Sequence, residues 1–200
     1  MPFMPPEWAP HERTWMAFPP DSAAVADLDA DGLAAVRSAW ARVANAIVAF
    51  EPVTMVVAPA DVAVAVTLLD PGIDLLPAPL DDAWMRDIGP TFVHEDGRTA
   101  AVDWVFNGWG AQHWARWDAD SRIAATVAAA AGVPVIASTL VNEGGGFHVD
   151  GAGTVLLTQT VHLDPDRNPG ATKDSVLAEL RRTIGALRAV WLPRGLTRDY

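Results

Sequence analysis

The stretch "RDIGPTFVHEDGRTAAVDW", residues 86–104, decides the fold of this chain. An Asp-Gly pair inside it is a turn signal, and the residues on either side, 91–94 and 99–104, favour β-structure, so the stretch predicts a β-hairpin. Its start is unusual, because two adjacent charges, Arg86 and Asp87, precede residues that favour apolar packing. Either the two charges belong to a solvated turn, or they face a cleft and hold a ligand.

The same pattern occurs a second time further along the chain. Residues 146–149 and 154–158 are expected to pair as strands around another Asp-Gly turn. Each hairpin has a lead-in segment that combines an acid with glycine, "RDIGP" at 86–90 and "NEGGG" at 142–146, and each is followed by an expected helix and strand. This weak internal repeat indicates stacked or radially arranged modules.

Outside the hairpins, expected helices alternate with short expected strands, which is typical of an α/β fold with mixed strand pairing. The expected helices cover residues 30–50, 61–69, 121–131 and 172–187. The expected strands cover residues 53–58, 73–78, 133–137 and 189–192. Residues 2–20 are rich in proline and are expected to be extended and irregular.

The composition narrows the classes of protein to which the chain can belong. Half of its 200 residues are hydrophobic, which is enough for the core of one domain or slightly more. The 25 acidic residues outnumber the 14 basic ones, and the net charge of −11 disfavours nucleic-acid binding, because phosphate contacts need clustered Lys and Arg. Cys, a signal peptide and a membrane-length apolar stretch are all absent, so we expect a cytoplasmic protein that binds no membrane. Homo-oligomer formation stays open.

Two carboxylates stand at corresponding places in the repeat. Asp87 and Glu143 each come at the start of the first strand of a hairpin, with glycine close behind. If a pseudo-rotation relates the modules, both carboxylates point toward the same axis, and two such acids suit a planar cation such as a guanidinium group. The ring of Trp84, Trp109 or Trp114 could stack on that cation. The alternative is a solvated ion pair in one lead-in segment and a flexible glycine turn in the other.

The histidines give weaker signals. His148 and Asp150 lie two residues apart on one face of an expected strand, where the acid could orient a general base. The alternative is that His148 is an ordinary strand residue and Asp150 starts the turn. The other histidines have no partner at metal-ligand spacing, and the run of three glycines lacks the rest of a phosphate-binding loop, so we expect no metal site.

Six blocks of the sequence, in this order and taken together, resemble those of one enzyme family. The blocks are "MPPEWAPHERTWMAFP" (4–19), "DDAWMRDIGPTFV" (81–93), "VDWVFNGWG" (102–110), "EGGGFHVDGAGTVLLTQ" (143–159), "DPDRNPG" (164–170) and "WLPRGL" (191–196). The family is that of the agmatine deiminases, which includes the related Porphyromonas-type peptidylarginine deiminases. The resemblance implies the pentein fold, an α/β propeller of five ββαβ-like modules in pseudo-fivefold array. Residues 1–200 would then form the N-terminal part of a single pentein domain, with the propeller incomplete in this chain.

The resemblance also implies an activity. Agmatine and water would give N-carbamoylputrescine and ammonia, without a metal or organic cofactor, as a step of agmatine catabolism and polyamine (putrescine) biosynthesis. A cysteine thiolate would attack the guanidinium carbon and form a thiouronium intermediate. Carried over by motif position, Asp87 and Glu143 would be the catalytic and substrate-binding acids, and Trp84 would form a wall of the substrate pocket.

The chain departs from the family pattern in one respect. In the family, a proton-relaying histidine and a second guanidinium-binding aspartate belong to a later Gly-His-Val-Asp block, and the nucleophilic cysteine lies near the C-terminus. The block "FHVDG" at 147–151 is a different one. We therefore expect the 200 residues to be an N-terminal portion that is inactive alone. The alternatives are a non-catalytic fragment that binds guanidinium groups and a peptidylarginine deiminase that acts on proteins.

Overall fold

The computed structural model describes residues 1–25 and 27–195. The chain divides into two compact units. Residues Met1–Ala9, Arg86–His113 and the chain from Ser121 onward form the first, here called the hairpin unit. Residues Pro10–Met85 and Trp114–Asp120 form the second, here called the parallel-sheet unit. That residues 1–200 form the N-terminal part of a single pentein domain stays a prediction.

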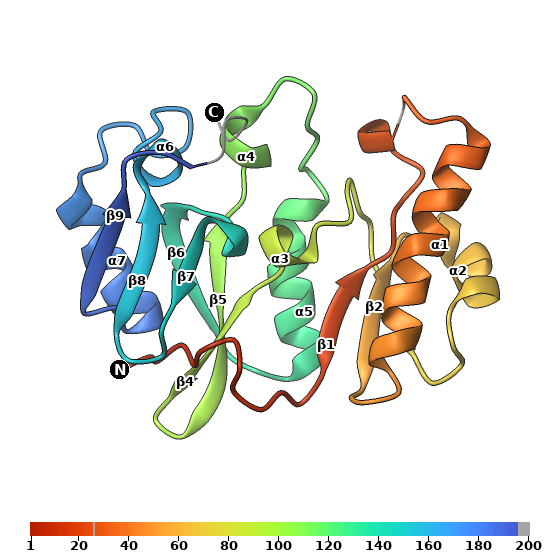
Figure 1. Ribbon diagram of the computed structural model, residues 1–200, viewed down its shortest axis with the longest axis horizontal. Coiled ribbons are helices and arrows are strands. Elements are labelled where there is room, and N and C mark those ends of the chain that lie inside the picture. The colour runs from red at the N-terminus through yellow and green to blue at the C-terminus, as the bar shows by residue number, and fades with distance from the viewer. Residues whose placement is uncertain (26, 196–200) are drawn as a thin grey trace. The chain divides into compact units, whose positions relative to one another are not determined.

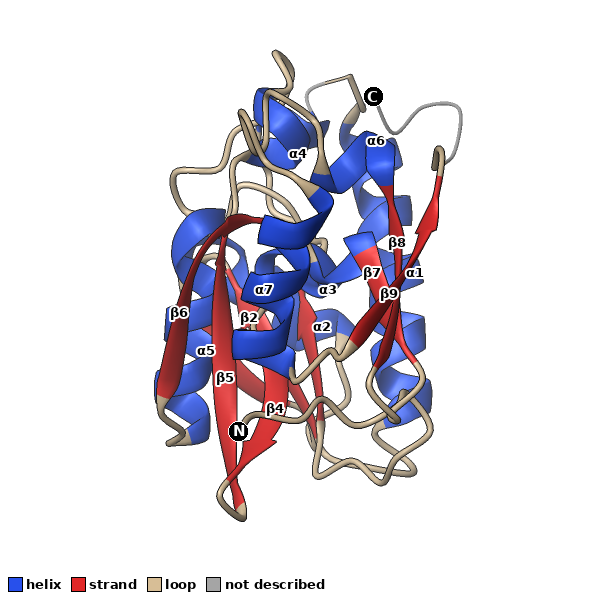
Figure 2. Ribbon diagram, turned by 90° about the vertical axis from the view of Figure 1, so that its left-hand side faces the viewer, coloured by secondary structure: helices blue, strands red, loops and turns tan. Residues whose placement is uncertain are grey.

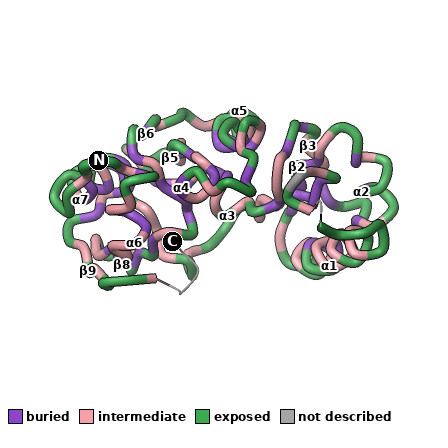
Figure 3. Tube along the Cα trace, turned by 90° about the horizontal axis from the view of Figure 1, so that it is seen from above, coloured by how far each residue is buried: buried purple, intermediate pink, exposed green. Residues whose placement is uncertain are grey.

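The parallel-sheet unit is a three-stranded parallel sheet with helices. Its strands are β1 (Thr14–Ala17), β2 (Val53–Val57) and β3 (Asp74–Pro77), in the order β1-β2-β3. Its helices are α1 (Ala30–Ile47) and α2 (Val62–Leu68), with 3₁₀ turns at Ala23–Val25 and Pro59–Asp61. All five residues of the central strand β2 are buried (Figure 3), and Val53, Met55 and Val57 share a core cluster with residues of α1 and α2.

The hairpin unit contains the repeat that the sequence predicts. Strands β4 (Thr91–Glu95) and β5 (Arg98–Val105) pair antiparallel, and α5 (Ile123–Ala131) leads to β6 (Val135–Val141), which pairs parallel with β5. Strands β7 (Phe147–Val149) and β8 (Thr154–Thr158) also pair antiparallel, and α7 (Lys173–Ile184) leads to β9 (Arg188–Leu192), which pairs parallel with β8 (Figure 1). Two ββαβ modules with mixed pairing are therefore present.

Helix α7 connects the two modules. It lies between the sheet β4-β5-β6 and the sheet β7-β8-β9 (Figure 2), and its side chains Val176, Leu180 and Ile184 belong to one core cluster with both sheets. The sheet residues of that core include Val93, Val102, Trp104, Phe147, Val149, Val155 and Leu157. Each fully buried aliphatic side chain contributes about 1.5–3 kcal/mol, so this core holds the modules together.

The N-terminal residues of the chain complete the hairpin unit. Phe3 exchanges two backbone hydrogen bonds of 2.8 Å with His94 in β4, and Met4 N–H donates to the carbonyl oxygen of Ile184 at 3.1 Å. The side chain of Glu7 accepts two hydrogen bonds from Arg86, each of 2.9 Å. This short segment therefore joins a strand, the end of α7 and the lead-in segment of the first hairpin.

Several boundaries differ from the sequence prediction. Strand β1 lies inside the Pro-rich segment that was expected to be irregular, because its partner β2 comes much later in the chain. Helix α7 ends three residues early, where Gly185 adopts a left-handed φ of 74°. Strand β6 runs to Val141 because the long strand β5 pairs with it that far. Leu196, the last residue of the sixth block, lies outside the described residues.

The remaining elements are short. They are α3 (Met85–Ile88), α4 (Gly108–Ala111), a 3₁₀ turn at Asp120–Arg122, a 3₁₀ turn at Gly144–Gly146 and α6 (Gln159–His162). Among the helices that the structure describes, none combines the length and hydrophobicity that a membrane crossing requires.

Candidate active site

Asp87 lies on the single helical turn α3, just before β4, whereas the sequence placed it at the start of the strand itself. Its Oδ2 accepts the indole N–H of Trp109 at 3.1 Å, and its Oδ1 accepts the backbone N–H of Gly145 at 3.0 Å. The neighbouring Arg86 binds Glu7 instead. The two adjacent charges therefore have different partners, and Asp87 joins the lead-in segments of both hairpins.

Glu143 follows β6 directly and is 3% exposed. Both of its carboxylate oxygens lie near Nε of Arg167, at 2.9 and 3.3 Å, and Nη1 of Arg167 donates to Asp164 at 2.8 Å. The Glu143 carboxylate is therefore already paired with a guanidinium group of the chain itself, that of Arg167. Sequence reasoning assigned no role to Arg167, although the block "DPDRNPG" that contains it was the available signal.

The run of three glycines allows the two lead-in segments to touch. A Cβ at Gly144 would lie 2.3 Å from the carbonyl oxygen of Arg86, and a Cβ at Gly145 would lie 2.4 Å from Oδ1 of Asp87. A side chain at Gly144 would force the backbone of Arg86 to shift, and one at Gly145 would displace the Asp87 carboxylate. The glycines therefore let the second lead-in segment come close to that of the first module.

Burial perturbs both acids. It raises the pKa of the Asp87 carboxyl, and the N–H donors of Trp109 and Gly145 oppose that rise only in part. It also raises the pKa of Glu143, against the charge and hydrogen bond of Arg167, and the negative charge of Asp87 adds to the rise. The two carboxylates thus lie within electrostatic reach of each other and are poorly solvated, which favours a cation at this place.

Trp109 is held in an unusual backbone conformation. In α4 the four residues from Gly108 to Ala111 have φ values of 68°, 58°, 87° and 55°, so the turn is left-handed. The amide of Ala111 donates to the carbonyl oxygen of Asn107 at 2.9 Å, and the Trp109 ring packs edge-on against Phe106 at 5.1 Å. Left-handed conformations are unfavourable for residues other than glycine, and such strain is often found at functional sites.

Replacing Ala111 with Gly is expected to raise the free energy of unfolding by up to about 1 kcal/mol, because the left-handed φ of 55° strains a Cβ. The matched control is Ala129→Gly in the right-handed helix α5, which should instead lose about 1 kcal/mol. Urea denaturation of the 200-residue chain measures both changes. Equal losses in the two variants would contradict a strained left-handed turn.

The structure places the other predicted residues as follows. Trp84 belongs to the parallel-sheet unit, is 51% exposed and packs edge-on against Trp40 at 5.8 Å. Oδ1 of Asp150 accepts the backbone N–H groups of Ala152 at 2.7 Å and of Thr154 at 2.8 Å, so Asp150 stabilises the turn. His148 is an exposed residue of β7. The reading of Asp150 as a turn residue is confirmed.

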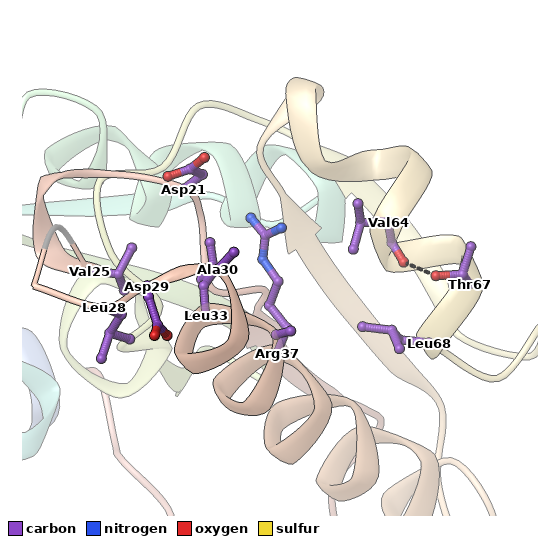
Figure 4. A pocket seen from close by; sticks show the side chains of 11 residues that line it. Asp21, Val25, Leu28, Asp29, Ala30, Leu33, Arg37, Val64, Thr67 and Leu68 are labelled. Carbon is purple, nitrogen blue, oxygen red and sulfur yellow. Dashed lines mark hydrogen bonds between the residues drawn. The ribbon is translucent and has the colours of Figure 1, made fainter.

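The parallel-sheet unit contains a pocket of about 580 Å³ near the first turns of α1 and beside α2 (Figure 4). Arg37 extends into its lining, but Nε of Arg37 donates to the carbonyl oxygen of Pro19 at 3.0 Å and Nη2 donates to Asp61 at 2.6 Å. The guanidinium group of Arg37 therefore stabilises the fold through these two contacts. The pocket contains neither Asp87 nor Glu143, so it is separate from the predicted acids.

Comparison with known proteins assigns the chain to a family. The model of the Porphyromonas-type peptidyl-arginine deiminases matches residues 3–200. The chain belongs to this family. The deiminase resemblance seen in the six sequence blocks is therefore confirmed.

The relatives that this chain matches are longer than the chain itself. A Streptomyces coelicolor protein named "Putative agmatine deiminase" is 60% identical over 199 residues, which cover 98% of this chain and 58% of the relative. The agmatine deiminase of Stutzerimonas stutzeri is 38% identical, with 98% and 54% covered. The solved agmatine deiminase of Enterococcus faecalis superposes with a TM-score of 0.87 at 34% identity, covering 96% of this chain and 53% of that one. The chain thus spans about half the length of the relatives it matches.

Proposed function

We propose that this chain provides the part of an agmatine deiminase that recognises the guanidinium group. The reaction of that hydrolase would convert agmatine and water to N-carbamoylputrescine and ammonia, with no cofactor. The observation that carries the proposal is the state of Asp87, a partly buried carboxylate whose two hydrogen-bond donors are neutral. Arg86 and Arg167 also act on its charge, but neither donates either of these two hydrogen bonds. We propose that a guanidinium ligand, a planar cation that matches a carboxylate, supplies the charged partner.

The roles of the site residues follow from this chemistry. We propose that Asp87 accepts hydrogen bonds from the guanidinium nitrogens of the substrate, and that Glu143 is the second acid of the site. A wall formed by Trp84 stays a prediction. Deimination by way of a thiouronium intermediate needs a cysteine thiolate, and the 200 residues contain no Cys. We therefore propose that this chain binds agmatine but does not release ammonia from it.

Replacing Asp87 with Ala is expected to weaken agmatine binding to the 200-residue chain about tenfold to a hundredfold, because a hydrogen bond to a charged group is lost. Isothermal titration calorimetry measures the affinity. The control is Asp174→Ala, which removes an exposed acid of α7 and should leave the affinity unchanged. Equal affinities for Asp87→Ala and the unsubstituted chain would sink the role of Asp87, and ammonia release by the chain would refute the proposed inactivity.

The family assignment favours one alternative, a deiminase that acts on arginine within proteins. Both substrates present the same guanidinium group, and they differ in what is attached to its far end. Titration with an acetylated arginine amide beside agmatine separates the two readings. Preference for the peptide-like ligand would favour the alternative, and comparable saturable binding of both without turnover would favour a general guanidinium-binding fragment.

We propose that further ββαβ modules complete the fold as a pentein propeller. The support comes from the two modules of the hairpin unit. Helix α5 covers one face of the sheet β4-β5-β6 and α7 covers the other, and residues on both faces of β5 are therefore buried. In the sheet β7-β8-β9, α7 covers one face, and on the opposite face, among residues 1–25 and 27–195, Leu156, Val190 and Leu192 are 40%, 49% and 41% exposed. A helix of a next module fits this apolar face.

A further inference from the structure

Arg167 is a buried residue that contacts Glu143 and has no role in the proposed reaction so far. We propose that Arg167 is a positioning residue that holds the Glu143 carboxylate in its ionised form and fixes its place beside Asp87. The inference rests on the proposed function only in treating Glu143 as part of the site. Its evidence lies in the contacts of Arg167, in the way the arginine is held and in its connection to Asp87.

The contact between Arg167 and Glu143 is closed to solvent. Both side chains are 4% exposed, and Nε of Arg167 lies 2.9 and 3.3 Å from the two oxygens of Glu143. An unpaired carboxylate at that depth would take up a proton, because burial strongly disfavours the charged form. Arg167 therefore supplies the positive charge that lets Glu143 stay ionised.

The backbone that carries Arg167 is itself fixed. Asn168 N–H donates to the carbonyl oxygen of Asp164 at 2.7 Å, which closes the turn. The side chain of Asn168 then binds the backbone of Val141, accepting its N–H at 3.0 Å and donating to its carbonyl oxygen at 2.9 Å. Val141 ends β6 two residues before Glu143. The turn that presents the arginine is thus fastened beside the acid that it binds.

The same turn supports the residue that binds Asp87. A Cβ at Gly110 would lie 2.9 Å from Nη1 of Arg167, so the left-handed turn of α4 rests against the arginine. Asn107, which precedes that turn, donates from Nδ2 to the carbonyl oxygen of Asp166 at 2.9 Å. Trp109 lies between these two anchor points and donates to Asp87. One short segment therefore sets the positions of both carboxylates.

The charges around Glu143 determine how its pKa changes when Arg167 is removed. Asp87 is the other acid that acts on Glu143, and it raises the pKa. Asp164 faces Arg167 on its other side at 2.8 Å. His162 is neutral near pH 7, because burial and the charge of Arg167 lower its pKa to about 4. Without Arg167, Glu143 would lose its paired cation and keep the unfavourable charge of Asp87, so it would be protonated at a higher pH; Arg86 packs against the neighbouring Gly144 and Gly145 but pairs with Glu7.

The test is a carboxyl titration of the full 200-residue chain by NMR with carbon-13 glutamate, the Glu143 signal being assigned with Glu143→Gln. In Arg167→Met we expect the pKa of Glu143 to rise by about one pH unit or more, because the paired cation is gone. In Arg167→Lys the pKa of Glu143 should rise less than in the Met variant, because lysine restores the positive charge but not the planar, forked set of N–H donors. The indole signal of Trp109 should shift in the Met variant as well.

The matched control is Arg182→Met, which removes an exposed arginine from its pair with Glu179 on α7. That variant should raise the pKa of Glu179, now held at about 2, and leave Glu143 unchanged. A folded Arg167→Met chain with an unchanged Glu143 titration overturns the proposal. If that variant does not fold, Asp164→Asn loosens the hold on Arg167, and an unchanged Glu143 and Trp109 signal in it is equally decisive. The NMR titration contains no substrate, so its outcome is independent of the agmatine calorimetry. If the chain binds no agmatine but Arg167→Met alters the Glu143 titration, the proposed function is refuted and the role of Arg167 stands.

Discussion

Replacing Leu180 with Ala lowers the expected free energy of unfolding of the chain by about 2–5 kcal/mol. Leu180 is 0% exposed and lies on α7, where its side chain belongs to the core shared by the two sheets of the hairpin unit. Removing three carbons there loses buried apolar area and leaves a cavity that neither sheet can close alone. Equilibrium denaturation in urea, followed by tryptophan fluorescence, gives the change.

The control for this experiment is Leu156→Ala on the opposite face of β8. Leu156 is 40% exposed, so the same truncation should cost less than about 1 kcal/mol. The ratio of the two losses tests whether α7 joins the modules. Similar losses at the two positions would mean that α7 contributes no more to stability than the uncovered sheet face does.

Replacing Gly144 with Ala is expected to lower the free energy of unfolding by about 1–3 kcal/mol, because the new methyl group would meet backbone. The Cβ would lie 2.3 Å from the carbonyl oxygen of Arg86, and a backbone atom moves aside less easily than the end of a side chain. The α3 turn would have to shift and take Asp87 with it. The indole N–H resonance of Trp109, which reports its hydrogen bond to Asp87, should therefore shift in the same variant.

Gly146→Ala provides the control from the same run of glycines. Its Cβ would meet Cγ1 of Val161 at 3.3 Å, a side-chain atom that can give way by a few tenths of an ångström. We expect a smaller loss of stability and an unshifted Trp109 resonance. An equal loss in both variants would show that the close approach of Gly144 to Arg86 is not what requires glycine.

Local signals account for what the sequence predicted of the fold. The Asp-Gly turns placed both hairpins, and Gly132 and Gly185, in left-handed conformations, end α5 and α7. Strand β1 was missed because a strand that pairs only with a distant segment carries little signal of its own. The left-handed turn of α4 was not predicted, because a positive φ at Trp109 runs against the preference of that residue.

The candidate site was predictable to the extent that it repeats. Asp87 and Glu143 occupy like places in two similar modules, and their common surroundings follow from that symmetry. Arg167 has no counterpart in that comparison, and its pairing with Glu143 joins residues 24 apart, with the β7-β8 hairpin and α6 between them. Such a contact depends on where the turn is fastened, which the two hydrogen bonds from Asn168 to Val141 decide.

The hydrogen bonds of the N-terminal segment have a consequence for synthesis on the ribosome. Phe3 and Met4 bind β4 and the end of α7, so these two residues are translated long before their partners, the last of which is Ile184. Most of the parallel-sheet unit is a single continuous stretch, residues 10–85, and only 114–120 come later. Domains tend to fold as their residues emerge, so the parallel-sheet unit can form first, while the hairpin unit stays open until translation has passed α7. Phe3 and Met4 therefore stay without these partners while the parallel-sheet unit is synthesised.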